Sequence, residues 1–239
     1  MTNAEAPRLS MRQRRITGLV IYNALMVLLC LVIIYPLIWT IFSSFKTNQQ
    51  IFSESPINLI PRPFTTDNYQ KLLTIYDVPL MVFNGLYLAI VIPVLSMLTS
   101  SMAAYALARL RFRGRNVIFL LLISTMMIPG YVTLIPNFAI MVKLKLLNSH
   151  WALILRSALS GSATSIFLFR QFFLSIPRDL ENAAIVDGCG RFRIFAQIML
   201  PLIKPGIVAM SIFTIKFAWN DFMWPLIVNT SMNKMTLGP

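Results

Sequence analysis

Long runs of apolar residues restrict the folds open to this chain more than any other feature. Crossing a hydrocarbon core about 30 Å thick takes an α-helix of roughly 20 residues. Five segments are long and apolar enough: 16–42, 81–107, 116–138, 151–173 and 206–228. Only 12% of the residues are charged, about half the share in soluble domains. The sequence therefore predicts an all-α, polytopic membrane protein and excludes a soluble enzyme core.

The first apolar run follows a basic N-terminal stretch, and this combination also occurs in secretory signal peptides. The run is longer than the apolar core of a signal peptide. No small-residue cleavage site of the Ala-x-Ala kind follows it. We therefore interpret it as a spanning helix that the mature protein retains.

The basic residues are distributed unequally over the connections between spans. Cytoplasmic connections are enriched in Lys and Arg. If the N-terminus is inside, the connections on that side carry twelve arginines, and those on the other side carry six basic residues. The twelve are Arg8, Arg12, Arg14, Arg15, Arg109, Arg111, Arg113, Arg115, Arg170, Arg178, Arg191 and Arg193. Residues 1–15 are thus predicted to form a cytoplasmic basic tail.

The formal net charge of +13 could instead indicate binding to nucleic acid. No groove of interleaved aromatic residues and no known binding module accompanies the arginines. Membrane topology explains the basic excess better, and no nucleic-acid partner is expected.

Charged side chains inside apolar spans are costly unless they face a partner, a cavity or a helix end. Arg156, Lys216 and Asp221 lie in such positions. Aromatic rings beside amide and carboxylate groups suit a hydroxyl-rich ligand such as a sugar. The candidate substrate pathway therefore consists of Lys216, Trp219, Asn220, Asp221 and Trp224. Trp also gathers at membrane interfaces whatever the function, so this alternative stays open.

Residues for chemistry are scarce in this sequence. The single histidine, His150, has no acid or nucleophile nearby in the sequence, and no triad, metal motif or phosphate-binding loop is present. Cys30 and Cys189 lie far apart and indicate neither a disulfide framework nor a metal site. We therefore expect no catalytic residue, no cofactor and no metal, and the driving energy must come from an ion gradient or another chain.

A short helix is predicted in the connection between the fourth and fifth spans. Ser175 can cap its start, Pro177 suits its first turn, and Gly188 can take the left-handed conformation that ends it. Leu180, Ala183 and Ala184 are spaced to share one face. Alanines allow close approach, so this helix is predicted to dock onto a partner.

The same segment resembles the EAA motif of bacterial ABC importer permeases. Asn182-Ala183-Ala184 is followed after three residues by Gly188, and nine residues later by Ile198-Met199-Leu200-Pro201. The sequences at 42–46, 64–69 and 219–226 are similar to the carbohydrate branch, the maltose-type and glycerol-phosphate-type permeases. The resemblance covers nearly the whole chain. One departure is that Asn182 stands where the motif has Glu, with Glu181 one position earlier.

The resemblance implies a type I ABC importer transmembrane domain over 16–239, with a coupling loop at about 174–200. It implies a permease subunit, not an enzyme, in the inner membrane of a bacterial cell. Its partners would be a second permease, an ATP-binding subunit dimer, an extracytoplasmic solute-binding protein and membrane lipid, and its substrate a sugar-like solute. The residues coupled to the ATPase would be Glu181, Asn182, Ala183, Ala184, Asp187 and Gly188.

Members of that family usually continue through a sixth helix, whereas five spans are readable here. We therefore expect either a truncated or frameshifted product or a protein with one helix fewer, and favour the former. The alternative function that remains open is a stand-alone, gradient-driven carrier or channel.

Overall fold

The structure is a computed structural model that describes residues 11–53, 55, 58–159 and 161–238, without the side chains of 11–14, 158 and 159. Every regular element in this part is helical, which confirms the all-α prediction. The chain divides into two compact units, the first ending at Tyr76 and the second beginning at Asp77. Most of the predicted basic tail, residues 1–10 with Arg8, lies outside the described residues.

The first unit contains α1 (Met11–Ser43), α2 (Asn48–Ser53) and α3 (Asp67–Ile75). From Arg15 to Ser43, α1 is apolar enough to span a membrane. The connection after it is tied back by Asn68, whose side-chain amide donates to the carbonyls of Ser44 (3.0 Å) and Lys46 (2.8 Å). The segment following α1 therefore folds back on itself as a compact connection.

The second unit contains the remaining helices. They are α4 (Val78–Arg109), α5 (Arg115–Thr125), α6 (Leu134–Lys143), α7 (His150–Ile154), the π-helix η1 (Leu155–Leu159), α8 (Ala163–Ser175), α9 (Arg178–Val186), α10 (Arg191–Ile194), the π-helix η2 (Phe195–Met199), α11 (Leu200–Leu202), α12 (Lys204–Asn220), α13 (Met223–Val228) and the 3₁₀-helix η3 (Met232–Lys234).

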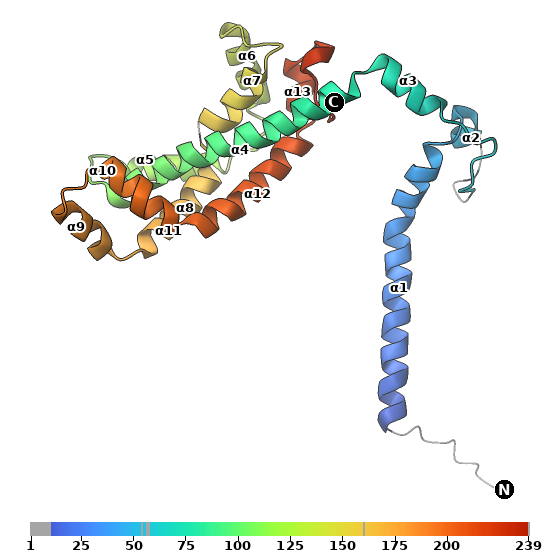
Figure 1. The fold of residues 1–239 in the computed structure, drawn as a ribbon, viewed down its shortest axis with the longest axis horizontal. Coiled ribbons are helices and arrows are strands. Elements are labelled where there is room, and N and C mark those ends of the chain that lie inside the picture. Colours follow the sequence, from blue (N-terminus) through green and yellow to red (C-terminus); the bar gives the residue numbers. More distant parts are fainter. Residues whose placement is uncertain (1–10, 54, 56–57, 160, 239) are drawn as a thin grey trace. The chain divides into compact units, whose positions relative to one another are not determined.

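The centre of this unit is α4, which packs along both α8 and α12 (Figure 1). Small residues make the close contacts possible. A Cβ added to Gly206 on α12 would lie 2.6 Å from the ring of Phe172 on α8. Ser100 on α4 accepts a hydrogen bond from the backbone N–H of Ser162 at 3.0 Å, and thereby holds the start of α8. The buried core lies between these helices.

Two predicted spans are continuous helices of sufficient length, α1 and α4. A third candidate combines Arg191–Leu202 with Lys204–Asn220, two segments that meet at a bend of 77°. The helices α5 and α6 are apolar but short. By length and composition, the described residues therefore contain two spanning helices, or three if the bent pair is one span.

The three remaining predicted spans are interrupted, which their uniform hydropathy did not reveal. The span predicted at 116–138 is divided into α5 and α6 by turns over 126–133. The span at 151–173 changes from α7 through η1 to α8. The span at 206–228 stops at Asn220 and resumes at Met223.

Prolines in the predicted spans have different effects on the continuity of the helices. Pro36 and Pro93 lie inside the continuous helices α1 and α4. Pro129 lies in the turns between α5 and α6 and thus marks a full break, not a kink. Pro136 is in the first turn of α6, where its missing N–H leaves no helix bond unmade. Of these four prolines, Pro36 and Pro93 therefore lie inside a helix where a helix bond is lost.

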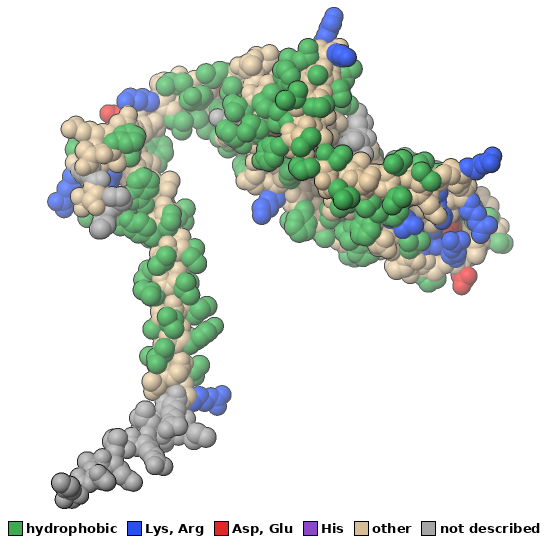
Figure 2. Space-filling model, turned by 180° about the vertical axis from the view of Figure 1, so that it is seen from behind, with side chains coloured by type: hydrophobic (Ala, Val, Ile, Leu, Met, Phe, Trp, Pro, Cys, Tyr) green, Lys and Arg blue, Asp and Glu red, His purple; other side chains and the backbone are tan. Residues whose placement is uncertain are grey.

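Basic side chains gather at one end of the second unit, around α9 and α10 (Figure 2). Arg111, Arg115 and Arg178 line one cavity there, although they come from two different connections. At the opposite end, Asn148 holds the 229–234 segment by accepting hydrogen bonds from the backbone of Thr230 (2.6 Å) and Ser231 (3.0 Å). The two arginine-rich connections are thus brought together, as the charge pattern predicts.

Candidate functional site

The predicted docking helix is α9, and its end is built as expected. Gly188 has φ +79°, the left-handed conformation. The N–H of Cys189 bonds to Ala184 O at 2.9 Å, and that of Gly188 bonds to Ile185 O at 3.0 Å. This pair of bonds is the Schellman motif that satisfies the last helix carbonyls.

The start of α9 differs from the prediction. Ser175 is the last residue of α8, and its hydroxyl donates to Phe172 O at 2.8 Å, so it does not cap α9. Pro177 occupies the N-cap position itself, and no side chain caps it. Because α8 ends so close to the start of α9, the side chain of Ser175 bonds to the last turn of α8 and not to the first turn of α9.

The six predicted coupling residues do not share one face of α9. Asn182, Ala183 and Asp187 are exposed, as is Gly188, whereas Glu181 and Ala184 are buried within the chain. Of the three residues expected to share the docking face, Leu180 and Ala183 are exposed and Ala184 is buried. A helix with alternate exposed and buried positions presents one face to its own protein and keeps the other open.

Glu181 is the polar centre of the buried face. Its Oε1 accepts hydrogen bonds from Arg191 Nη1 at 2.7 Å and from the hydroxyl of Tyr105 at 3.2 Å. Its Oε2 lies 4.0 Å from Arg109 Nε. A buried carboxylate is stable only when it is paired and hydrogen-bonded, and Glu181 is both.

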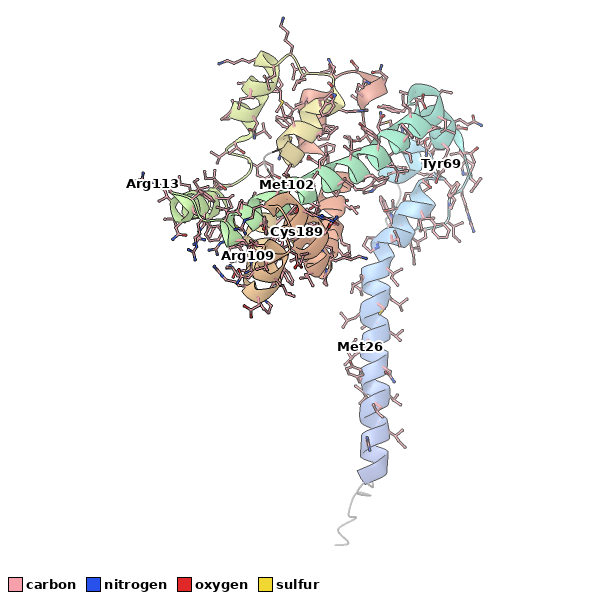
Figure 3. The ribbon with its side chains drawn as sticks, turned by 60° about the vertical axis from the view of Figure 1, so that its left-hand side comes forward. Met26, Tyr69, Met102, Arg109, Arg113 and Cys189 are labelled. Carbon is pink, nitrogen blue, oxygen red and sulfur yellow. The ribbon has the colours of Figure 1, made fainter. Side chains whose placement is uncertain are left out.

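Arg109 joins three helices at this point (Figure 3). It is the last residue of α4, its guanidinium donates to the carbonyls of Phe173 and Ile176 at the end of α8, and it faces Glu181 on α9. Its side chain is 2% exposed. We call Tyr105, Arg109, Glu181 and Arg191 the anchor cluster. It fixes the helix α9 to the ends of α4 and α8.

A cavity of about 700 Å³ lies at the other end of the second unit. Four of the five predicted pathway residues line it: Lys216, Asn220, Asp221 and Trp224. The fifth, Trp219, is not among the lining residues and instead packs on Gly85 of α4, where an added Cβ would lie 3.3 Å from its ring. Four of the five residues of the candidate pathway therefore lie together at one cavity, and Trp219 lies apart from them.

All three interruptions of the predicted spans meet at this cavity. Gly130 and Tyr131 come from the break between α5 and α6, Arg156 from the π-helix η1, and Asp221 and Phe222 from the break between α12 and α13. At membrane depth, irregular backbone is tolerated where it lines a cavity or is buried in protein. Broken helices commonly form solute sites in transporters.

Arg156 and Asp221 form an ion pair inside the cavity, with Arg156 Nη1 3.8 Å from Asp221 Oδ2. The guanidinium also lies over the Trp224 ring, 4.8 Å from its centroid, an arrangement that favours a cation. Trp224 is held by a hydrogen bond from its indole N–H to Ala152 O at 3.2 Å. Arg156 was recognised in the sequence as an intramembrane charge, but spacing alone gave it no partner.

Tyr131 and Gly130 are cavity residues that sequence reasoning missed. The Pro129-Gly130 pair was the available signal, because such pairs break helices.

Among the described residues, no group of three or more His, Cys, Asp or Glu could hold a metal ion. His150 contacts the ring of Tyr87, and its burial lowers its pKa, as does the charge of Lys234.

Comparisons with known proteins agree with this architecture. Residues 96–239 match the family described as "Binding-protein-dependent transport system inner membrane component". The arabinooligosaccharides transport system permease protein AraQ of Halalkalibacterium halodurans is 40% identical over 207 residues, which cover 85% of this chain and 73% of that protein. The diacetylchitobiose uptake system permease protein NgcG of Streptomyces coelicolor is 34% identical over 217 residues, or 91% and 71%.

A solved structure shares the fold. The crystal structure of a bacterial ABC transporter involved in the import of the acidic polysaccharide alginate contains a chain that matches with a TM-score of 0.76 at 25% identity. The match covers 97% of this chain and 80% of the other.

Proposed function

This chain belongs to the family of binding-protein-dependent transport system inner membrane components, and from this premise we propose how it couples ATP hydrolysis to solute movement. It is a permease subunit of a sugar ABC importer and a multi-pass protein of the cell membrane. ATP hydrolysis belongs to a separate subunit, and the importer includes another permease and a substrate-binding protein. The comparisons favour this function over a stand-alone carrier.

The proposed topology has five crossings, with the N-terminus and the α9–α10 end on the cytoplasmic side. The arginines gathered at that end support this orientation, because basic connections are retained in the cytoplasm. The segments from α1 to α4 and from α6 to α7 would then lie outside, together with the 229–234 segment. The transporter domain would extend over 16–239.

The exposed face of α9 is the proposed contact with the ATP-binding subunit. Asn182, Ala183, Asp187 and Gly188 are available to a partner. Glu181 supports the contact by holding the helix through the anchor cluster, and Ala184 does so by packing into the apolar core. Closure of the ATPase dimer would then move the ends of α4 and α8 together with α9.

The proposed solute pathway runs past the 700 Å³ cavity. The observation that carries this proposal is the convergence of three helix interruptions on one cavity that also contains an aromatic-backed ion pair. Its aromatic side chains can stack on the apolar faces of a sugar, and its polar groups can bond sugar hydroxyls.

Affinity purification tests the coupling proposal. The chain is tagged at its N-terminus, extracted gently from its native membrane, and the co-purifying proteins are identified by mass spectrometry. We expect an ATPase and a second permease. Ala183→Trp should lose the ATPase and keep the permease, because a bulky ring prevents close docking.

The matched control is Ala209→Trp, at an exposed alanine of α12 far from α9 in the sequence. It should retain both partners. Retention of the ATPase by Ala183→Trp would move the contact away from α9.

A further inference from the structure

The side chains that line the cavity carry an excess of positive charge. Arg156 and Lys216 are its cations, and Asp221 is the single carboxylate among the lining residues. The other lining residues are uncharged at neutral pH. Two cations and one anion leave one positive charge facing the same space.

Arg156 and Asp221 neutralise each other's charge. Their ion pair at 3.8 Å and the stacking of the guanidinium on Trp224 hold both groups against the wall. Asp221 Oδ1 also accepts a bond from the backbone N–H of Trp224 at 3.4 Å, at the start of α13. The only carboxylate of the cavity is thus committed to Arg156 and to the broken helix.

Lys216 is the second cation of the cavity, and it is not part of the Arg156–Asp221 ion pair. It lies one turn before Asn220, whose side-chain amide donates to Lys216 O at 2.8 Å. None of the ion pairs within the described part of the chain includes Lys216. An ammonium in an apolar spanning helix is unfavourable unless it meets an anion or a water-filled path. The cavity that it lines is where such an anion can reach it.

We propose that the cavity recognises a sugar that carries an anionic group, a carboxylate, sulfonate or phosphate, and that Lys216 contacts this group. The inference rests on the proposed function, because it assigns a solute class to the same cavity. Trp224 offers a ring face to the sugar, and Asn220 and Tyr131 offer partners to its hydroxyls. The ammonium supplies the charge-assisted hydrogen bond that a neutral sugar cannot use.

Paired solutes test the inference in the assembled importer. The complete importer is reconstituted in liposomes, and ATP-dependent uptake is measured for galacturonate and galactose, glucuronate and glucose, and sn-glycerol 3-phosphate and glycerol. The ratio of uptake within each pair is then compared between wild type and Lys216→Gln. Because the binding protein is the same in both preparations, its own preference cancels from this comparison.

We expect the wild type to take up a charged member, and Lys216→Gln to lower the charged-to-neutral ratio by about tenfold, the effect of one charge-assisted bond. Lys216→Arg keeps the charge and should keep the ratio within about threefold. Lys204→Gln removes a lysine from the same helix without touching the cavity. It lies twelve residues away, about 18 Å along α12, and should leave the ratio unchanged.

The outcomes separate the inference from the function on which it rests. Uptake of neutral sugars alone, or equal loss of both members of a pair in Lys216→Gln, overturns the anionic solute and leaves the importer intact. An assembled importer that takes up no solute of the panel with ATP contradicts both.

Discussion

Glu181 and Asn182 are adjacent in the sequence but have opposite surroundings. The carboxylate of Glu181 is buried among Tyr105, Arg109 and Arg191, whereas Asn182 is exposed. The charge next to the motif therefore stabilises this chain internally, and the exposed position carries an uncharged amide. A sequence motif identifies the helix, but only the packing shows which of its side chains a partner can reach.

Replacing Glu181 by Gln should weaken the anchor cluster. Arg109 would remain buried without a counter-charge, which costs about 2 kcal/mol. We expect a lower unfolding temperature of the purified importer and more ATP hydrolysed per solute transported. Asp179→Asn is the control, since Asp179 is an exposed acid on the same helix. Equal behaviour of the two variants would show that the cluster has no special role.

Gly188 and Gly190 form a matched pair for testing the end of α9. A Cβ would meet nothing within 4 Å at either position. Only Gly188 has a positive φ, +79°, while Gly190 has φ −69°. Gly188→Val should cost about 1–2 kcal/mol and abolish transport by misplacing α9, Gly188→Asn should cost less, and Gly190→Val should be tolerated. Uptake assays and thermal unfolding check these outcomes, and normal uptake by Gly188→Val would exclude a requirement for this turn.

The helices differ in how far the sequence predicts them. The continuous helices α1 and α4 follow directly from apolar length. The break at Asp221 has a local signal that hydropathy does not use, Pro225, whose ring and missing N–H prevent a helix bond to the carbonyl of Asp221. The π-helix η1 has no local signature. Both depend on contacts with distant residues, Arg156 with Asp221 and Trp224 with Ala152. Hydropathy registers composition along the chain but not contacts across it.

The contact between α8 and α12 depends on a missing side chain. A Cβ at Gly206 would lie 2.6 Å from the Phe172 ring, so Gly206→Val should destabilise the importer by about 1–3 kcal/mol. Adding Phe172→Ala should recover part of this loss, because the ring is the obstacle. Gly18→Val, at an open position of α1, is the control. A double-mutant cycle on unfolding temperature measures the coupling, and strictly additive losses would contradict a direct contact.

Basic residues are distributed unequally along the chain, and in the second unit they gather at one end. Its arginine-rich connections meet at the α9–α10 end, where Cys189 also lies (Figure 3). The family and the all-α fold followed from one loop motif and from apolar length. The cavity required the structure, because its walls come from segments 91 residues apart, from Gly130 to Asp221.

Two cysteines allow the orientation to be measured directly. In a Cys30→Ser background, a membrane-impermeant maleimide should label Cys189 only when the cytoplasmic side is open. In a background with both native cysteines replaced by Ser, Lys143→Cys at the exposed end of α6 should be labelled from outside. Labelling of both sites from the same side would refute the proposed topology.

The π-helix Leu155–Leu159 contains Arg156, and it determines how a deletion in this segment would change the cavity. A π-turn contains one residue more than the α-turn that it replaces. Deleting a single codon within it would remove this extra residue and let the winding of α7 continue as a regular α-helix. Arg156 lies inside the π-helix, so the deletion would change the direction of its side chain and separate it from Asp221. A single deletion would thus change the charge that lines the cavity without a substitution in the contacts between α8 and α4.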